Sequence, residues 1–260
     1  MVVRPELVPD PALSRDEMAE LQREIRASAT FDDDGSIDPT ILANPPTAVG
    51  SDEAPVVAGV DQAFLDEHVI SAVVVMRGGS VVERVHALTP LEIPYVPGLL
   101  SFREGRPILE AVEALSIDPD LYLFDGSGRI HFREAGIATH MGVILDVPAI
   151  GVAKRLLCGT PVDDLENLPA GSRVPIEANS RVEAPEGTLL GYAVQTKQYD
   201  SPNRHVNPLY VSPGHRIGAE TAADVVLALS TEYKLPDPVR LADAYTSEAK
   251  EEYSEERIGE

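Results

Sequence analysis

The spacing of apolar residues divides the chain into strands and helices. Residues 14–27 carry apolar side chains at helical spacing behind Ser14 and Glu17, a capping pattern that predicts an amphipathic helix. Three β-rich segments follow, at residues 55–64, 71–79 and 80–88. The pair Gly78–Gly79 between the last two predicts a tight hairpin, so we expect three antiparallel strands here.

The second half of the chain alternates helices and strands. We expect helices near residues 106–115, 135–145, 219–230 and 239–251, and strands at 121–124, 149–154, 189–196 and 208–214. Residues 30–55 and 160–188 are rich in Pro, Gly and polar side chains, which predicts loops on the surface. Three antiparallel strands followed by parallel ones predict a mixed α/β sheet flanked by helices.

These elements predict one domain with extensions at both ends. Residues 1–55 form an N-terminal helix and an acidic, Pro/Gly-rich loop, residues 56–247 the main domain, and residues 248–260 an acidic tail. No apolar run is long enough to span a bilayer, and no signal-peptide pattern precedes residue 14. Cys158 is the only cysteine, which excludes an internal disulfide and fits a small buried apolar residue. We therefore expect a cytoplasmic monomer without a membrane partner.

The net charge of −22 argues against a nucleic-acid partner, but its distribution weakens that argument. Residues 77–155 carry 10 acidic and 8 basic side chains, so almost all of the excess acid lies elsewhere, notably at residues 32–34 and after residue 247. There are only 4 Lys against 17 Arg. This acid-rich, lysine-poor composition resembles that of proteins adapted to high salt.

Asp61 and Asp125 each end an apolar strand. Strands that lie side by side would bring these carboxylates together, and like charges at close range require a cation. Oxygen ligands favour Mg²⁺ or Mn²⁺, and Glu104, on a turn before a helix, would add a third acid. Each acid taken alone also fits a surface or capping role. Gly126 and Gly128 would let the backbone approach whatever Asp125 faces.

Three further residues have a chemical and a structural interpretation. Tyr95 lies between Pro94 and Pro97, which stiffen the backbone, so its ring could stack on a base or pack under its own loop. Lys154 ends a strand and could contact a phosphate or be solvated. His215 precedes a helix and could carry a proton near a metal-bound water or act as a capping residue.

Six motifs in a fixed order resemble the endonuclease V family: GVDQAF, IPYVPGLLSFREG, LFDGSGRIHFREAGIATHMGV, PAIGVAK, YVSPGHRI and LPDPVRLAD. They cover residues 56–243. The resemblance implies a ribonuclease-H-like fold and an enzyme that hydrolyses the second phosphodiester 3′ to a deaminated base, deoxyinosine above all, during DNA repair. The alternatives are an inosine-specific endoribonuclease and a binding protein for inosine or branched DNA that does not cleave.

The resemblance also implies roles for individual residues. Asp61, Asp125 and Glu104 would hold Mg²⁺, with Mn²⁺ as a substitute, and Lys154 and His215 would lie near the scissile phosphate. Tyr95 would be a wedge that fills the gap left by the extruded base. The pocket for that base would be lined by two turns and a histidine: Gly98, Leu99, Leu100, Gly126, Ser127, Gly128 and His131. The chain departs from the family pattern at Phe132 and Asn207, where the family commonly has Pro and Lys.

Overall fold

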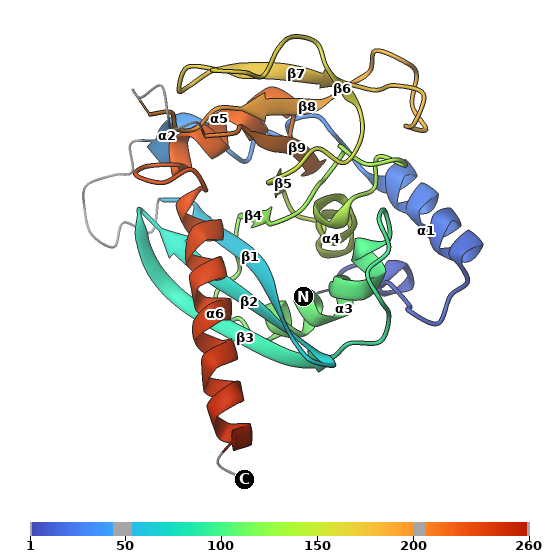
Figure 1. The fold of residues 1–260 in the computed structure, drawn as a ribbon, viewed down its shortest axis with the longest axis vertical. Helices are drawn as coiled ribbons and strands as arrows, with labels where there is room; N and C mark the ends of the chain where they lie inside the picture. Colours follow the sequence, from blue (N-terminus) through green and yellow to red (C-terminus); the bar gives the residue numbers. More distant parts are fainter. Residues whose placement is uncertain (1, 44–53, 200–205, 259–260) are drawn as a thin grey trace.

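The computed structural model describes residues 2–43, 54–199 and 206–258, which form one mixed sheet with helices on both faces (Figure 1). Within these ranges, nine strands pair in the order β3-β2-β1-β4-β5-β9-β8-β7-β6. The strands are β1 (Val56–Leu65), β2 (His68–Arg77), β3 (Ser80–Pro90), β4 (Leu121–Phe124), β5 (Ala149–Ala153), β6 (Thr160–Pro161), β7 (Arg173–Glu177), β8 (Leu189–Val194) and β9 (Leu209–His215). This arrangement confirms the expected mixed α/β class.

The helices are the short η1 (Pro5–Leu7) and α1 (Arg15–Ser28), α2 (Pro39–Ala43), α3 (Leu100–Glu113), α4 (Ile137–Leu145), α5 (Ala219–Leu229) and α6 (Asp237–Ile258). The capping box at the start of α1 is present, with Ser14 and Glu17 bonded to each other's backbone N–H groups. None of the helices in the described ranges combines the length and the apolar character that crossing a bilayer requires.

Strands β1, β2 and β3 form the expected antiparallel meander, and β4 and β5 extend it in parallel. Gly78 and Gly79 both have positive φ, at 56° and 81°, as the tight hairpin between β2 and β3 requires. Strand β2 begins at His68, three residues before the expected start at Ser71, because the chain turns at Asp66, whose φ is 51°. The first hairpin is therefore shorter than the sequence suggested.

Helix α3 begins at Leu100, six residues before the expected start at Arg106. The local sequence argued against this, because Gly105 and Pro107 weaken a helix. Packing outweighs that preference. Phe102 is buried, and a Cβ on Gly105 would lie 2.8 Å from Pro9 Cγ and 3.0 Å from Met141 Cε. The glycine thus lets α3 approach its neighbours closely, and the segment expected to be a turn is helical.

Three segments expected to be loop or tail contain regular structure. Residues 160–188 include β6 and β7, which pair with each other and extend the sheet through β8. Helix α2 forms within residues 30–55, of which 44–53 lie outside the described residues. Helix α6 continues to Ile258, so residues 248–258 form its last turns rather than a separate acidic tail.

The sheet has an apolar cluster on each face. Tyr122 and Phe124 of β4 face α1, α3 and α4, while Leu121 and Leu123 face α5 and α6. This alternation follows from the two-residue period of a strand.

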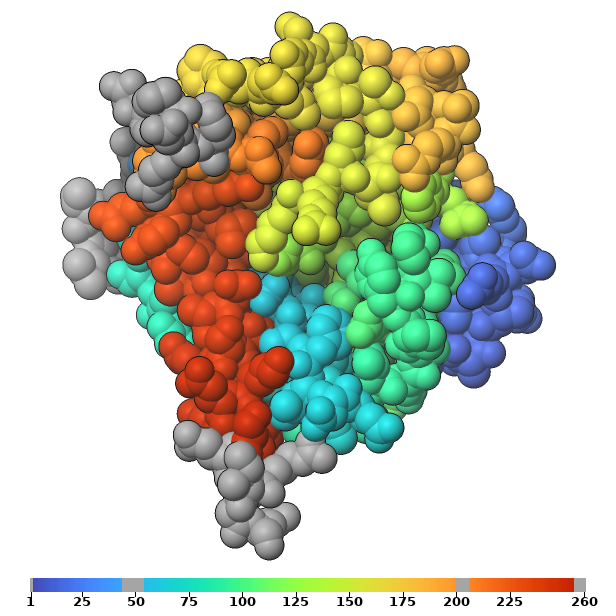
Figure 2. Space-filling model, viewed as in Figure 1, coloured from blue at the N-terminus to red at the C-terminus, as the bar shows by residue number. Residues whose placement is uncertain are grey.

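Asp61 lies within β1, while Asp125 and Lys154 directly follow β4 and β5, so these polar residues gather towards the C-terminal ends of the parallel strands. Figures 1 and 2 show α6 (red) lying beside β1 (blue to cyan).

Candidate metal centre

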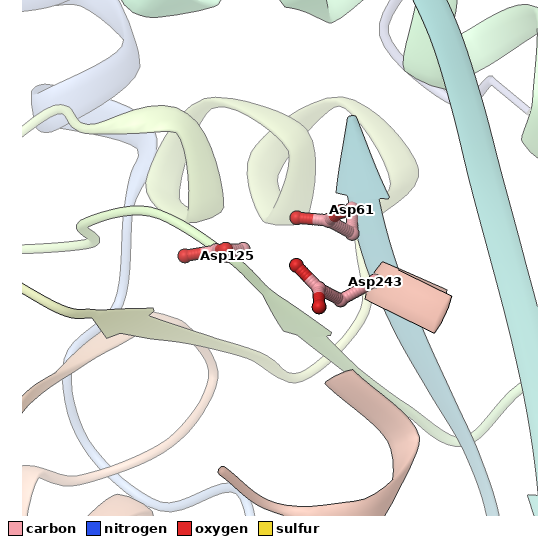
Figure 3. A group of neighbouring side chains, drawn as sticks. All are labelled: Asp61, Asp125 and Asp243. Atoms are coloured by element: carbon pink, nitrogen blue, oxygen red, sulfur yellow. The ribbon is translucent and has the colours of Figure 1, made fainter. Parts of the chain in front are cut away.

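Three aspartates meet near the C-terminal end of β4, in the centre of the sheet. Strands β1 and β4 are parallel neighbours in which Val60 pairs with Phe124, so Asp61 and Asp125 each come one residue after that pair. Asp243 reaches the same point from α6 (Figure 3). One carboxylate oxygen from each of the three residues lies within 4.8 Å of the others. The predicted pair of aspartates is therefore brought together, and a third acid joins it. Asp61 does not end its strand as expected, because β1 continues to Leu65 through its pairing with β2.

The close approach of α6 to β1 makes the third carboxylate available. A Cβ on Gly59 would lie 2.1 Å from the backbone of Pro238, so only glycine allows the start of α6 to lie against β1. Five residues further along, the helix presents Asp243 beside Asp61. The sequence interpretation missed Asp243 as a ligand, although it is the last residue of the motif LPDPVRLAD.

The other two carboxylates add to the cost of ionising the buried Asp61. Burial, followed by the charges of Asp125 and Asp243, raises the pKa of Asp61 to about 8. A divalent cation would remove this cost by neutralising the cluster. Three carboxylate oxygens form a hard donor set that fits Mg²⁺ or Mn²⁺ and lacks the nitrogen and sulfur ligands typical of zinc. The donor chemistry of the site thus fits the expected metal.

Lys154 lies beside the acids, as its place at the end of β5 predicts. Its Nζ donates to Asp125 Oδ2 at 2.7 Å and lies 3.6 Å from Asp243 Oδ1. Burial opposes its charge, but the neighbouring carboxylates outweigh that effect and raise the pKa of Lys154. A cavity of about 620 Å³ adjoins this lysine, and Arg155, Asn207 and Tyr210 are among the residues that line it. The site is therefore open on the Lys154 side and carries positive charge there.

Glu104 lies on α3 rather than on a turn before a helix, which corrects the sequence interpretation. It is buried, and burial together with the charge of Asp125 raises its pKa to about 8, while Arg103 acts in the opposite direction. It is not a member of the group of three aspartates whose oxygens lie close together. Glu104 on α3 is therefore close enough to feel the charge of Asp125, although it is outside the group of three aspartates.

Two of the residues expected to form a base pocket are joined by a hydrogen bond. The backbone N–H of Arg133 donates to Nδ1 of His131, so Nε2 carries the proton and donates to the Gly98 carbonyl at 3.0 Å. Burial lowers the pKa of His131 to about 4, which keeps the ring neutral. Gln22 of α1 also donates to the Gly98 carbonyl, at 2.8 Å. These bonds connect the turn before α3 to the loop after β4.

Packing within the protein also requires the glycines of these turns. A Cβ on Gly126 would lie 2.5 Å from Ile137, and one on Gly128 would lie 2.3 Å from the Pro213 carbonyl. Their close approaches are to the protein itself, so packing already requires glycine at both positions. Of the remaining pocket candidates, Leu99 is buried, and Leu100 and Ser127 are half-buried.

The loop before α3 presents an aromatic side chain to solvent. Tyr95 is 59% exposed, and Pro94 and Pro97 beside it are also exposed. The guanidinium of Arg103 lies 5.8 Å from the ring centroid. The alternative in which Tyr95 packs under its own loop is therefore wrong, and its ring is available for contact with another molecule.

His215 lies away from the acids, which contradicts its expected place beside the metal and the phosphate. Strand β9 runs antiparallel to β5, with His215 opposite Ala149 and Tyr210 opposite Ala153. His215 is thus at the opposite end of β5 from Lys154. The backbone N–H of Thr30 donates to its Nδ1 at 3.2 Å, and its Nε2 lies 3.3 Å from Asp146 Oδ1. Its role is to connect the segment after α1 to the sheet.

Comparison with known proteins identifies a family. The model of the endonuclease V family matches residues 46–244. The endonuclease V of Haloarcula marismortui is 58% identical over 262 aligned positions, covering 95% of this chain and 97% of that protein. The crystal structure of the Streptomyces avermitilis endonuclease V is 33% identical, with a TM-score of 0.75, and covers 95% of this chain and 99% of that one.

A second similar structure contains nucleic acid. It is the Ciona intestinalis endonuclease V in complex with a 24mer DNA that contains an inosine followed by a ribo-adenosine. It is 24% identical with a TM-score of 0.70, and it covers 92% of this chain and 98% of that one. Together with the sheet order, these likenesses confirm the ribonuclease-H-like fold implied by the sequence motifs.

Proposed function

Because this chain belongs to the endonuclease V family, we propose that it is a divalent-metal-dependent endonuclease that cuts nucleic acid beside deaminated bases, deoxyinosine above all. The single observation that carries this proposal is the meeting of Asp61, Asp125 and Asp243 within 4.8 Å, next to Lys154. A protein that only binds inosine would have no need to hold three carboxylates this close together, one of them buried. The metal centre therefore favours cleavage over binding alone.

In the proposed reaction, the three aspartates hold Mg²⁺, or Mn²⁺ in its place, through carboxylate oxygens. When bound, the cation supplies an activated water and neutralises charge that develops on the phosphate. Lys154 already lies 2.7 Å from Asp125 and is positively charged, so it can hold a non-bridging phosphate oxygen beside the acids. Glu104 is buried on α3 within the field of Asp125 and would act as a further acidic partner of the site.

Recognition of the base would occur next to this centre. We propose that the extruded base enters a pocket formed by Gly98, Leu99, Leu100, Gly126, Ser127, Gly128 and His131. The neutral His131 ring ties the two turns together, because it donates to the Gly98 carbonyl. The exposed ring of Tyr95, held between Pro94 and Pro97, would fill the gap left in the base stack. Extrusion costs least at a mispaired base, and this contributes to selectivity.

The strand would continue from the acids into the cavity beside Lys154. The cavity of about 620 Å³ has Arg155 in its lining and Tyr210 as an aromatic surface. Burial and the charge of Lys154 lower the pKa of Lys234, so a further cation lies near this edge. Positive side chains with an aromatic ring suit a single strand. In a chain with a net charge of −22, the cavity beside Lys154 and Arg155 is a region that suits a phosphate backbone.

The finer assignments follow the family. We propose hydrolysis of the second phosphodiester 3′ to the lesion, which leaves 3′-hydroxyl and 5′-phosphate ends and acts in DNA repair. Inosine-containing RNA is the second candidate substrate, because the inosine in the Ciona intestinalis complex is followed by a ribonucleotide. The working form would be a cytoplasmic monomer, for which light scattering should give a mass near 28.0 kDa.

The test is a nicking assay on matched strands that contain deoxyinosine or inosine, with Mg²⁺ or EDTA. We expect metal-dependent nicking of deoxyinosine strands, abolished by Asp125→Ala without loss of binding. Asp32→Ala, at an exposed site, serves as a control that retains activity. Normal nicking by Asp125→Ala would refute the proposal, and faster cleavage of inosine RNA would favour the second substrate.

The same assay tests the wedge. Tyr95→Ala should reduce nicking of duplexes about tenfold and Tyr95→Phe much less, because stacking is worth about 1–3 kcal/mol.

A further inference from the structure

A buried hydroxyl connects the two elements that carry the metal-centre aspartates. Thr246 lies on α6 three residues after Asp243 and is 2% exposed. Its Oγ1 lies 3.1 Å from Asp61 Oδ2, to which it donates, and 2.9 Å from the backbone carbonyl of Asp243. The side chain therefore touches the carboxylate of β1 and the backbone of the residue that supplies the carboxylate of α6.

We propose that Thr246 is a positioning residue that fixes the orientation of the Asp61 carboxylate for the divalent cation. This inference rests on the proposed metal-dependent function. A hydrogen bond to one oxygen of a carboxylate fixes its rotation about the Cβ–Cγ bond, and therefore also sets the direction of the other oxygen. Groups that orient metal ligands in this way commonly change metal affinity 10- to 100-fold when they are removed.

The chemistry of the two acceptors favours the Asp61 contact as the functional one, although the Asp243 carbonyl is slightly nearer. A hydroxyl has one proton to donate, and an ionised carboxylate accepts more strongly than a peptide carbonyl. When Asp61 is ionised around a cation, its Oδ2 is therefore the preferred acceptor. Thr246 thus acts through Asp61 and does not itself need to touch the cation.

Helix α6 does not depend on this hydroxyl to stay in place. The ring of His86 on β3 lies 2.9 Å from the Tyr245 hydroxyl through Nδ1 and 3.2 Å from the Tyr253 hydroxyl through Nε2. At the start of the helix, the backbone of Pro238 lies against Gly59. Loss of the Thr246 hydroxyl should therefore change the orientation of a ligand while α6 remains docked.

The experiment measures Mn²⁺ affinity of the full chain by calorimetry, without nucleic acid. Thr246→Val keeps the shape of the side chain and removes the hydroxyl, whereas Thr246→Ser keeps the hydroxyl. The matched control is Ser247→Ala, because Ser247 Oγ also donates to the Asp243 carbonyl, at 3.2 Å, but has no contact with Asp61 in the described structure. We expect about 10- to 100-fold weaker Mn²⁺ binding in Thr246→Val, and affinity within about threefold of the parent in the other two variants.

A purely structural role would give a different pattern. It would lower the melting temperature of Thr246→Val without raising the Mn²⁺ concentration that half-activates nicking, whereas a positioning role raises that concentration and lets saturating Mn²⁺ restore most of kcat. Thr246→Ala provides a second hydroxyl-free variant should Thr246→Val fold poorly. Parental Mn²⁺ affinity in either folded hydroxyl-free variant would overturn the inference. Failure of the parent chain to bind Mn²⁺, or equal binding by Asp125→Ala, would instead overturn the proposed function.

Discussion

Asp61 and Glu104 show that the site keeps acids where burial disfavours their charge. Each is about 95% buried, at 6% and 5% exposure, and the pKa of each is raised to about 8. In an unfolded chain, such groups ionise near pH 4. Without a cation, the folded protein therefore holds protons on these residues that the unfolded chain releases. This difference makes the stability of the metal-free protein depend on pH.

The sign of this dependence follows from linkage. A folded-state pKa above the unfolded value gives stability that is complete below about pH 4 and is lost as pH rises through about 8. The buried His131 and His140 have pKa values lowered to about 4, while an unfolded histidine titrates near 6.5, so their opposite contribution fades above about pH 7. Between pH 7 and 8 in EDTA, we expect the free energy of unfolding to fall by up to about 1.4 kcal/mol per pH unit for each acid.

Urea unfolding across this pH range tests the prediction. Asp61→Asn and Glu104→Gln should each make the slope shallower, because each removes one titrating group, while Asp32→Asn at an exposed site should leave it unchanged. Mg²⁺ should also flatten the slope, since a cation binds the ionised acids of the folded protein. A metal-free protein whose stability is constant from pH 7 to 8 would contradict the raised pKa values.

At the scale of elements, the docking of α6 on β1 decides whether the third aspartate reaches the site. An added Cβ on Gly59 would lie 2.1 Å from the Pro238 backbone. Because the opposing atoms belong to the backbone, rotation of a side chain cannot relieve this clash. We expect Gly59→Ala to cost about 1–3 kcal/mol or more of stability and to weaken Mn²⁺ binding, because α6 must shift with Asp243. Chemical unfolding and calorimetry measure the two effects.

The control for this substitution is a glycine with open space around it. Gly171 has a φ of +87°, and nothing lies within 4 Å of an added Cβ, so Gly171→Ala carries only a backbone penalty of about 1–2 kcal/mol. It should leave Mn²⁺ affinity unchanged. If Gly59→Ala retains full Mn²⁺ affinity, the close packing of α6 on β1 is not what positions Asp243.

The elements that the sequence predicts well are those set by local pattern. Alternating apolar residues and the Gly78–Gly79 pair were sufficient for the β1–β3 meander. Helix α3 was predicted too short, because Gly105 and Pro107 disfavour a helix locally, whereas the contacts that stabilise its first turns come from distant segments. Strand β7 was missed for a similar reason. It contains Pro175 and exists through its pairing with β8.

The same distinction applies to the candidate site. Asp61 and Asp125 were predicted because each follows an apolar run, and the parallel pairing of β1 with β4 places them side by side although β1 continues to Leu65. Asp243 lies on a helix, and its proximity depends on how α6 crosses β1, which no local pattern specifies. His215 was misplaced because the sequence does not reveal that β9 runs antiparallel to β5. The direction of a strand decides at which end of its neighbours its last residue lies.

At the scale of the whole molecule, the net charge of −22 exceeds what ion pairs can balance. There are 21 Lys and Arg against 43 acids, and several arginines are already paired, such as Arg26 and Arg129, each 2.7 Å from Glu134. Most acids therefore repel one another across the surface. At 0.1 M salt this repulsion extends over about 10 Å, and at 1 M over about 3 Å. Salt should relieve a repulsion that dilute buffer leaves in place.

We therefore expect stability to rise as KCl increases from 0.1 M towards molar concentrations. A gain of about 2 kcal/mol would raise the melting temperature by roughly 4–8 °C in a chain of this size. Calorimetric scans across a KCl series measure the shift. Neutralising exposed acids outside the site, as in Asp163→Asn with Asp164→Asn, should reproduce part of the gain at low salt. A melting temperature that is constant or falls with KCl would contradict the prediction.

Binding of nucleic acid should respond to salt in the opposite direction, because released counterions oppose phosphate contacts at high salt. Nicking activity then has two competing dependences, a gain in folded, metal-competent protein and a loss of affinity for the strand. At saturating substrate only the first remains, so kcat should rise with KCl while KM also rises. At low substrate, activity should pass through a maximum. Measuring kcat and KM separately at each KCl concentration distinguishes the two effects, and a kcat that is highest in dilute buffer would show that the acidic surface is not an adaptation to salt.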